Sequence, residues 1–80
     1  MNDFQYKQSM ETNFVKAGIN YLLGRYPDNI RYDAVGIELG ITGRHVRNLE
    51  QGRGASGPLQ KLIQLVIAKH RREEISENQN

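Results

Sequence analysis

The sequence predicts an all-α fold, a single small domain of four to five helices. Apolar residues recur at spacings of three and four along most of the chain, and no segment alternates apolar with polar residues as a strand does. Glycine and proline fall between the periodic segments, where helices are expected to end. A length of 80 residues allows one domain with a modest core. A partner subunit would add to that core, so we expect a homodimer.

The first predicted helix spans roughly Met10 to Leu23. It should end around Gly24 because Pro27 disfavours a helical conformation of the residue before it. We expect this helix to pack across the two that follow. Its apolar face is predicted from residues at helical spacing, namely Phe14, Gly18, Ile19 and Leu22.

Two short helices follow, from about Arg31 to Leu39 and from about Gly43 to Gln51. Gly40 lies between them, where the chain must bend and glycine permits a positive φ. Each helix has two apolar residues on one face, Val35 with Leu39 in the first and Val46 with Leu49 in the second. This pattern predicts a helical hairpin.

Three small or capping residues favour the same hairpin. Gly36 lies where two crossing helices would approach most closely and no large side chain fits. Thr42 is a good N-cap for the helix after the turn, because its hydroxyl accepts a backbone N–H. Gly52 is expected to end that helix.

The last predicted helix follows a loop over residues 53–57, and Pro58 suits its first position. Leu65 and Ile67 leave this helix apolar on more than one side. A dimer interface and a wide buried face explain that equally well. The stripe that closes the core is predicted to be Leu59, Leu62, Ile63 and Val66.

From Arg71 on, the chain is polar and is expected to be a fraying end or a flexible tail. The domain is therefore predicted over residues 1–70, with the hairpin over about 31–51 and the tail over 71–80. We find no second domain and no repeat in the sequence.

Charge is distributed unevenly along the chain. Residues 1–42 have four Lys or Arg against five Asp or Glu, whereas residues 43–72 have seven against one. A basic half that begins at the second helix of the hairpin favours a surface that binds a polyanion. A solvated charged surface would give the same pattern.

Composition argues against several classes of function. The chain has no cysteine and two histidines, and its carboxylates are scattered, so we expect no disulfide, metal site, cofactor or catalytic nucleophile, and no enzyme. No apolar run approaches the roughly 20 residues that cross a bilayer. The polar N-terminus does not resemble a signal peptide. The expectation is a soluble, unprocessed, cytoplasmic protein with no membrane partner.

The segment from Tyr32 to Gly52 resembles the helix-turn-helix of the Cro/C1 family, also called the lambda-repressor-like or XRE family. The resemblance covers roughly residues 20–68. The positions that match the family pattern, without a gap, are Val35, Gly36, Leu39, Gly40, Ile41, Thr42, Val46, Leu49, Glu50, Gln51 and Gly52. The resemblance implies a lambda-repressor-like fold that binds double-stranded DNA.

Two positions depart from the family, which usually has a capping Ser or Thr in place of Arg31 and Gln in place of Tyr32. The family also pairs an Arg of its first helix with a Glu of its third. The resemblance therefore implies a structural ion pair between Arg25 and Glu50, which we leave out of the binding site.

The resemblance places the helix that begins at Gly43 in the major groove, with its outward side chains against base edges. Arginine can bond both O6 and N7 of guanine, and asparagine both N6 and N7 of adenine. A phosphate contact or a free surface charge is the alternative for Arg47, and a solvent-facing side chain for Asn48 and His45. The candidate base-reading residues are Arg44, Arg47, Asn48 and His45.

Phosphate contacts are expected from helix N-termini, hydroxyls and basic side chains beside the groove. The glycine at 43 indicates a close backbone approach or one base fewer that is read. The glycine-rich loop after Arg53 suits the phosphate chain, although it would also serve as an ordinary connection. The candidates are Thr42, Gly43, Arg53, Tyr32 and Lys61.

We therefore expect a sequence-specific transcriptional regulator, most simply a dimeric repressor of its own or a neighbouring promoter. It would bind an inverted-repeat operator and lie with the nucleoid when bound. Phages and other mobile elements commonly encode such proteins. The alternative is an antitoxin or adaptor that binds another protein through its last helix and tail, and it would tolerate alanine at Arg44, Arg47 and Asn48.

Overall fold

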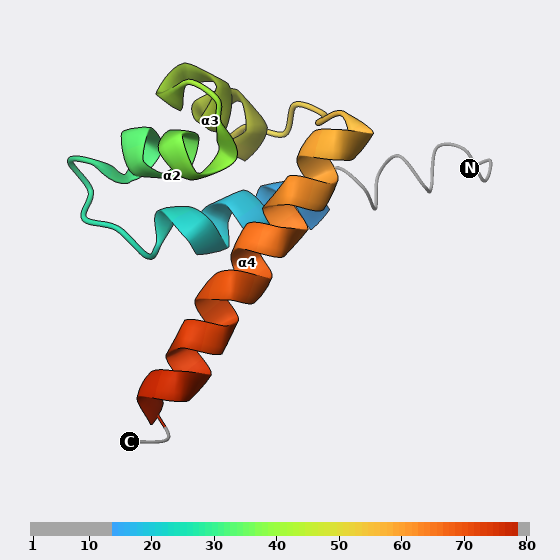
Figure 1. Ribbon diagram of the computed structural model, residues 1–80. Helices are drawn as coiled ribbons and strands as arrows, with labels where there is room; N and C mark the ends of the chain where they lie inside the picture. Colours follow the sequence, from blue (N-terminus) through green and yellow to red (C-terminus); the bar gives the residue numbers. More distant parts are fainter. Residues whose placement is uncertain (1–13, 79–80) are drawn as a thin grey trace.

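The computed structural model describes residues 14–78 of the chain. Over that range the chain forms four helices and no strand, which confirms the predicted all-α fold. The first helix covers residues 14–23, and Figure 1 labels the other three as α2 (Arg31–Leu39), α3 (Gly43–Glu50) and α4 (Gly57–Asn78). α2 packs against both α3 and α4.

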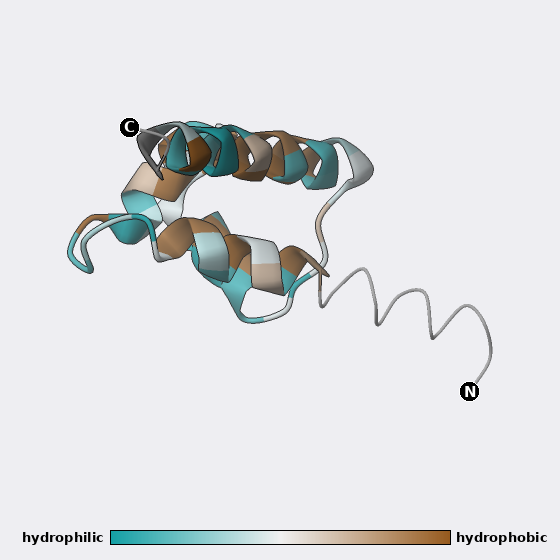
Figure 2. Ribbon diagram, turned by 90° about the horizontal axis from the view of Figure 1, so that it is seen from below, coloured by the Kyte–Doolittle hydropathy of each residue, from teal (hydrophilic) through white to brown (hydrophobic). Residues whose placement is uncertain are grey.

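Each of the four helices contributes to one core. Apolar residues occur along α4 as well as on the shorter helices (Figure 2). The inward members of these sets pack together, and the buried apolar residues are Val15, Ile19, Leu22, Leu23, Val35, Leu39, Val46, Leu49 and Ile63. The four hairpin residues predicted to be buried are thus confirmed.

The first helix is buried on a face that differs slightly from the predicted one. Phe14 is 43% exposed, and the neighbouring Val15 is buried instead. Gly18 explains the close packing of this helix on α4, because a Cβ there would lie 3.0 Å from Cδ1 of Ile67. The helix ends at Leu23 as predicted, and the expected start at residues 10–13 lies outside the described residues.

The turn after α2 has the geometry that its glycines predict. Gly40 has φ 69° and follows the last residue of α2. The N–H of Ile41 donates to the carbonyl of Gly36 at 2.9 Å, and that of Gly40 to the carbonyl of Ile37 at 3.3 Å, which together form a Schellman motif. A Cβ at Gly36 would lie 2.6 Å from the carbonyl oxygen of Ile41, so only glycine fits there.

α3 is capped at both ends by residues that the sequence identifies. Oγ1 of Thr42 accepts the N–H of His45 at 3.1 Å. At the other end Gly52 has φ 103°, and the N–H of Arg53 donates to the carbonyl of Asn48 at 3.1 Å. The helix ends at Glu50, one residue earlier than expected.

α4 begins at Gly57, one residue before the predicted start, and Oγ of Ser56 accepts the N–H of Leu59 at 3.3 Å. Of the predicted stripe, Ile63 is fully buried, whereas Leu62 is 36% exposed. The inward face continues instead to His70, which is buried. Leu59 and Val66 also pack against the core, so three of the four predicted residues are confirmed and Leu62 is the exception.

Residues 71–78, which were expected to form a fraying end or a flexible tail, continue α4 as helix. Glu74 gives the physical reason, because its Oε1 accepts the hydroxyl of Tyr21 at 2.8 Å and lies 2.7 Å from Nη1 of Arg25. These contacts attach a polar turn of α4 to the first helix and to the turn that follows it. Residues 79–80 lie outside the described residues.

Candidate nucleic-acid interface

The outward face of α3 presents polar and basic side chains. Val46 and Leu49 hold the opposite face in the core. Arg44, His45 and Arg47 are exposed. The fourth predicted base-reading residue, Asn48, is half-buried. Within the described part of the chain, no hydrogen bond or ion pair engages the side chain of Arg44 or Asn48, so both are available to a ligand.

An open depression separates the start of α2 from the outward face of α3. Its lining residues come from both helices and are Tyr32, Asp33, Gly43, Arg44, Arg47 and Asn48. Three predicted base-reading residues and two predicted phosphate contacts are thus brought together. Of the remaining candidates, His45, Thr42, Arg53 and Lys61 are exposed outside the lining of this depression.

Asp33 is the residue of the depression that the sequence analysis missed. It lies in the first turn of α2, where a carboxylate interacts favourably with the helix dipole. A Cβ at Gly43 would lie 2.8 Å from its Oδ1, so glycine at 43 lets α3 begin close against α2. A carboxylate here repels phosphate but can accept a hydrogen bond from the amino group of cytosine.

Tyr32 joins the start of α2 to α3. Its hydroxyl donates to Oε1 of Glu50 at 2.6 Å. The Cζ of Arg47 lies 4.9 Å from the centre of its ring, within the range of a cation–π contact. The Cζ of Arg31 lies 5.0 Å from the same ring centre. One aromatic ring therefore contacts two guanidinium groups, an arrangement that sequence spacing did not indicate.

The expected ion pair between Arg25 and Glu50 does not form. Arg25 pairs with Glu74 of α4, and Glu50 bonds to Tyr32. The reason is the extra length of α4, which brings a carboxylate to Arg25 from a turn that was predicted to be tail. Glu50 therefore ties α3 to α2.

A separate polar cluster joins α2 to α4 away from the depression. Nε2 of His70 lies 2.8 Å from Oε2 of Glu38, and the hydroxyl of Tyr26 donates to Oε1 of the same carboxylate at 2.5 Å. Glu73 approaches the other ring nitrogen of His70 at 3.9 Å. Burial, with the hydrogen bond to Glu38, raises the pKa of Tyr26 to about 12.

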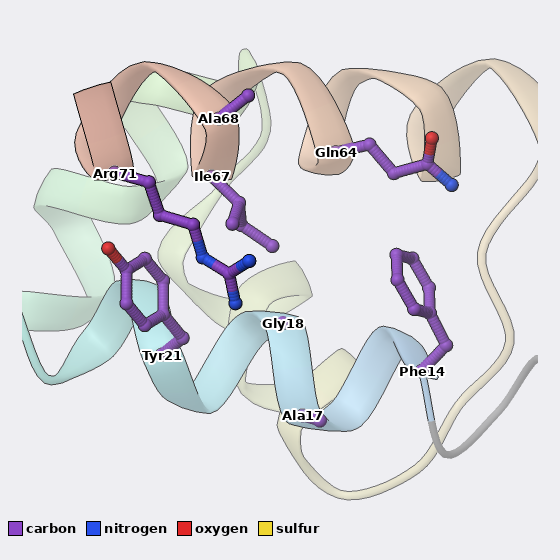
Figure 3. Close-up of a pocket in the computed structure, with 8 residues that line it drawn as sticks. All are labelled: Phe14, Ala17, Gly18, Tyr21, Gln64, Ile67, Ala68 and Arg71. Atoms are coloured by element: carbon purple, nitrogen blue, oxygen red, sulfur yellow. The ribbon is translucent and has the colours of Figure 1, made fainter.

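A second concave surface lies between the first helix and α4 (Figure 3). This groove is lined by Phe14, Ala17, Gly18, Tyr21, Gln64, Ile67, Ala68 and Arg71. Arg71 points across it, with its Cζ 5.7 Å from the ring centre of Tyr21. Burial and the hydrogen bond to Glu74 raise the pKa of Tyr21. Ile67 packs on the first helix, whereas Leu65 is 57% exposed, so a wide buried face explains only the former.

Among the helices that the structure describes, none has the length and hydrophobicity to span a bilayer. The same residues contain no group of three or more metal-ligating side chains. Comparison of the chain with protein-family models, with curated proteins and with solved structures finds no match.

Proposed function

We propose that this protein binds double-stranded DNA in a sequence-specific manner and regulates transcription, with α3 in the major groove. One observation carries the proposal. α3 has an exposed polar face, while its opposite face packs in the core and both of its ends are capped. Arg44, Arg47 and Asn48 lie on that face beside an open depression. Their donors suit guanine and adenine edges. The α2–turn–α3 unit would then be a helix-turn-helix.

The surroundings of the depression support phosphate binding on either side of it. Thr42 and Arg53 lie at the two ends of α3, and Lys61 lies near the start of α4. All three are exposed. Charged contacts of this kind position a protein on the duplex, and base contacts add sequence preference. We assign repression by a homodimer at an inverted repeat as the simplest mode for so small a domain.

The alternative, a protein-binding adaptor, has one observation in its favour. Leu65 and Leu62 leave part of α4 apolar and exposed. An adaptor would use this surface and would not need the side chains of α3. One protein could both bind DNA and bind a protein partner, because no residue of α4 lines the depression beside α3.

The test is selection of binding sites from a random duplex library with the full chain, followed by titration of the selected sequence at several salt concentrations. Enrichment of an inverted repeat with half-sites about one helical turn apart, and a steep loss of affinity with salt, would support a dimeric DNA reader. Failure to enrich any sequence would overturn the proposal and favour the adaptor.

Arg44→Ala supplies the residue-level test. We expect it to lower discrimination at one base pair by about 1–3 kcal/mol while changing the free energy of unfolding by less than about 0.5 kcal/mol. Arg72→Ala is the matched control, because it removes the same charge from an exposed position on the far half of α4. Equal effects of the two variants on base preference would contradict the role of Arg44.

A further inference from the structure

We propose that Tyr32 is a positioning residue that holds the guanidinium of Arg47 in the depression beside α3, and that Glu50 holds Tyr32. This inference rests on the proposed function, because it concerns how one of the base-reading side chains is oriented. It replaces the expectation that Tyr32 contacts a phosphate.

The geometry is a two-point attachment between one side chain of α2 and one side of α3. Arg47 and Glu50 are three residues apart in α3 and therefore lie on the same side of the helix. The guanidinium of the first lies over the ring of Tyr32 at 4.9 Å, and the carboxylate of the second accepts its hydroxyl at 2.6 Å. Glu50 thus fixes the ring, and the ring fixes the guanidinium.

The hydroxyl of Tyr32 is already engaged. It has one proton, and that proton is donated to Glu50. A hydrogen bond from the same hydroxyl to a phosphate oxygen would require the bond to Glu50 to break. The carboxylate would also repel a phosphate brought to that position.

A stacked arginine is well suited to reading a base. A cation–π contact uses the face of the guanidinium and leaves its N–H donors at the edge free for hydrogen bonds. A long side chain that is ordered before binding loses less conformational entropy when it binds. Arg31, on the same ring at 5.0 Å, increases the positive charge beside the depression.

The same three residue types recur elsewhere in the molecule, which provides a control. Tyr21 donates its hydroxyl to Glu74 and has the guanidinium of Arg71 over its ring at 5.7 Å. This second set lies between the first helix and α4, on the groove of Figure 3. A substitution of Tyr21 therefore measures how the loss of such a set affects folding, because this set does not line the depression beside α3.

The experiment measures binding of the selected operator and of its single-base variants by wild type, Tyr32→Leu, Tyr32→Phe and Tyr21→Leu. We expect Tyr32→Leu to lower preference at one base pair by about fivefold or more. Tyr32→Phe should have an intermediate effect on that preference, because it keeps the ring under Arg47 but removes the hydrogen bond to Glu50. Tyr21→Leu should retain it fully in the folded fraction. A uniform loss of affinity in Tyr32→Phe, without loss of preference in Tyr32→Leu, would instead establish the phosphate contact and overturn the inference.

A double-mutant cycle separates positioning from a direct role. If Tyr32 acts through Arg47, Tyr32→Leu should cause no further loss of preference in an Arg47→Ala background. Independent, additive losses from the two substitutions would overturn the inference.

A measurement without DNA separates failure of this inference from failure of the proposed function. The Nε–Hε resonance of Arg47 should have a ring-current shift in wild type that disappears in Tyr32→Leu. If wild type selects no DNA sequence but the shift is present, the proposed function fails and the stacked arrangement stands. If wild type selects a sequence and the shift is absent, the positioning role fails alone.

Discussion

α3 and the second half of α4 are both rich in charged residues, but the two segments use them differently. On α4, His70 and Glu74 are engaged by partners on α2 and on the first helix, respectively. On α3, the side chains of Arg44 and Asn48 have no such partner within the described residues, and apolar packing holds the helix from behind. His70 and Glu74 thus attach α4 to the rest of the fold, whereas Arg44 and Asn48 of α3 remain available and Glu50 of that helix bonds to α2. A polar side chain on a packed helix points to a ligand most clearly when packing and capping already hold the helix without it.

The largest loss of stability is expected from a change that disturbs the close packing of α2 against the turn before α3. Gly36→Ala would place a Cβ 2.6 Å from a backbone oxygen, which cannot move as a flexible side chain does. We expect the free energy of unfolding to fall by about 2–3 kcal/mol, as for other overpacked sites. Urea unfolding followed by circular dichroism measures it. Gly54→Ala is the control, because a Cβ there meets nothing within 4 Å, and equal effects of the two would contradict the close contact.

The polar attachment of α4 is tested by removing His70. The residue is 8% exposed, so His70→Ala leaves a cavity and deprives the half-buried Glu38 of a partner. We expect a loss of about 2 kcal/mol in the free energy of unfolding. His45→Ala, at the exposed histidine of α3, should cost less than about 0.5 kcal/mol. If the two variants lower the melting temperature by the same amount, His70 does not contribute more to stability than His45, and the prediction is wrong.

Unfolding at alkaline pH tests the polar attachment of α4 in a second way, because Tyr26 bonds to the same carboxylate as His70. Its folded-state pKa of about 12 lies above the ordinary 10.0, so its contribution to stability is complete below pH 10 and is lost as pH rises through about 12. Tyr26→Phe should therefore be less stable than wild type at pH 8, and the difference should narrow between pH 10 and 12. A constant difference across that range would contradict the raised pKa.

The smallest effect is expected from the pair of Arg25 and Glu74, whose side chains are 30% and 36% exposed. Arg25→Ala should lower the free energy of unfolding by no more than about 1 kcal/mol, because solvent screens such pairs. The loss should shrink further when the salt concentration is raised. A loss that is as large as that of His70→Ala, or independent of salt, would contradict this ranking.

The hairpin could be predicted almost residue by residue because its determinants are local. Gly40 and Gly52 adopt the positive φ that ends each helix, and Thr42 caps the next. Such rules act over a few residues, so they can be read without knowledge of the rest of the fold. The clustering of Arg44 and Arg47 on an exposed face followed from the same local periodicity.

The remaining features depend on contacts between distant segments. Whether Arg25 meets Glu50 or Glu74 is decided by the length and direction of α4, which no local pattern specifies. Tyr32 and Arg47 come together only because α2 crosses α3, so neither the stacked ring nor Asp33 could be found from spacing. The end of α4 was misjudged because a polar segment is stabilised as helix by partners 49 and 53 residues away.

The glycine at 36 has a consequence for how the outer surface of α3 can change. Because the backbone of one helix lies directly against the turn before the next, the position of α3 does not depend on which side chains point outward. The exposed positions 44, 45 and 47 are therefore free to accept other polar residues without moving the scaffold. The outer surface of this hairpin can thus vary, by evolution or by design, while the fold beneath it stays the same.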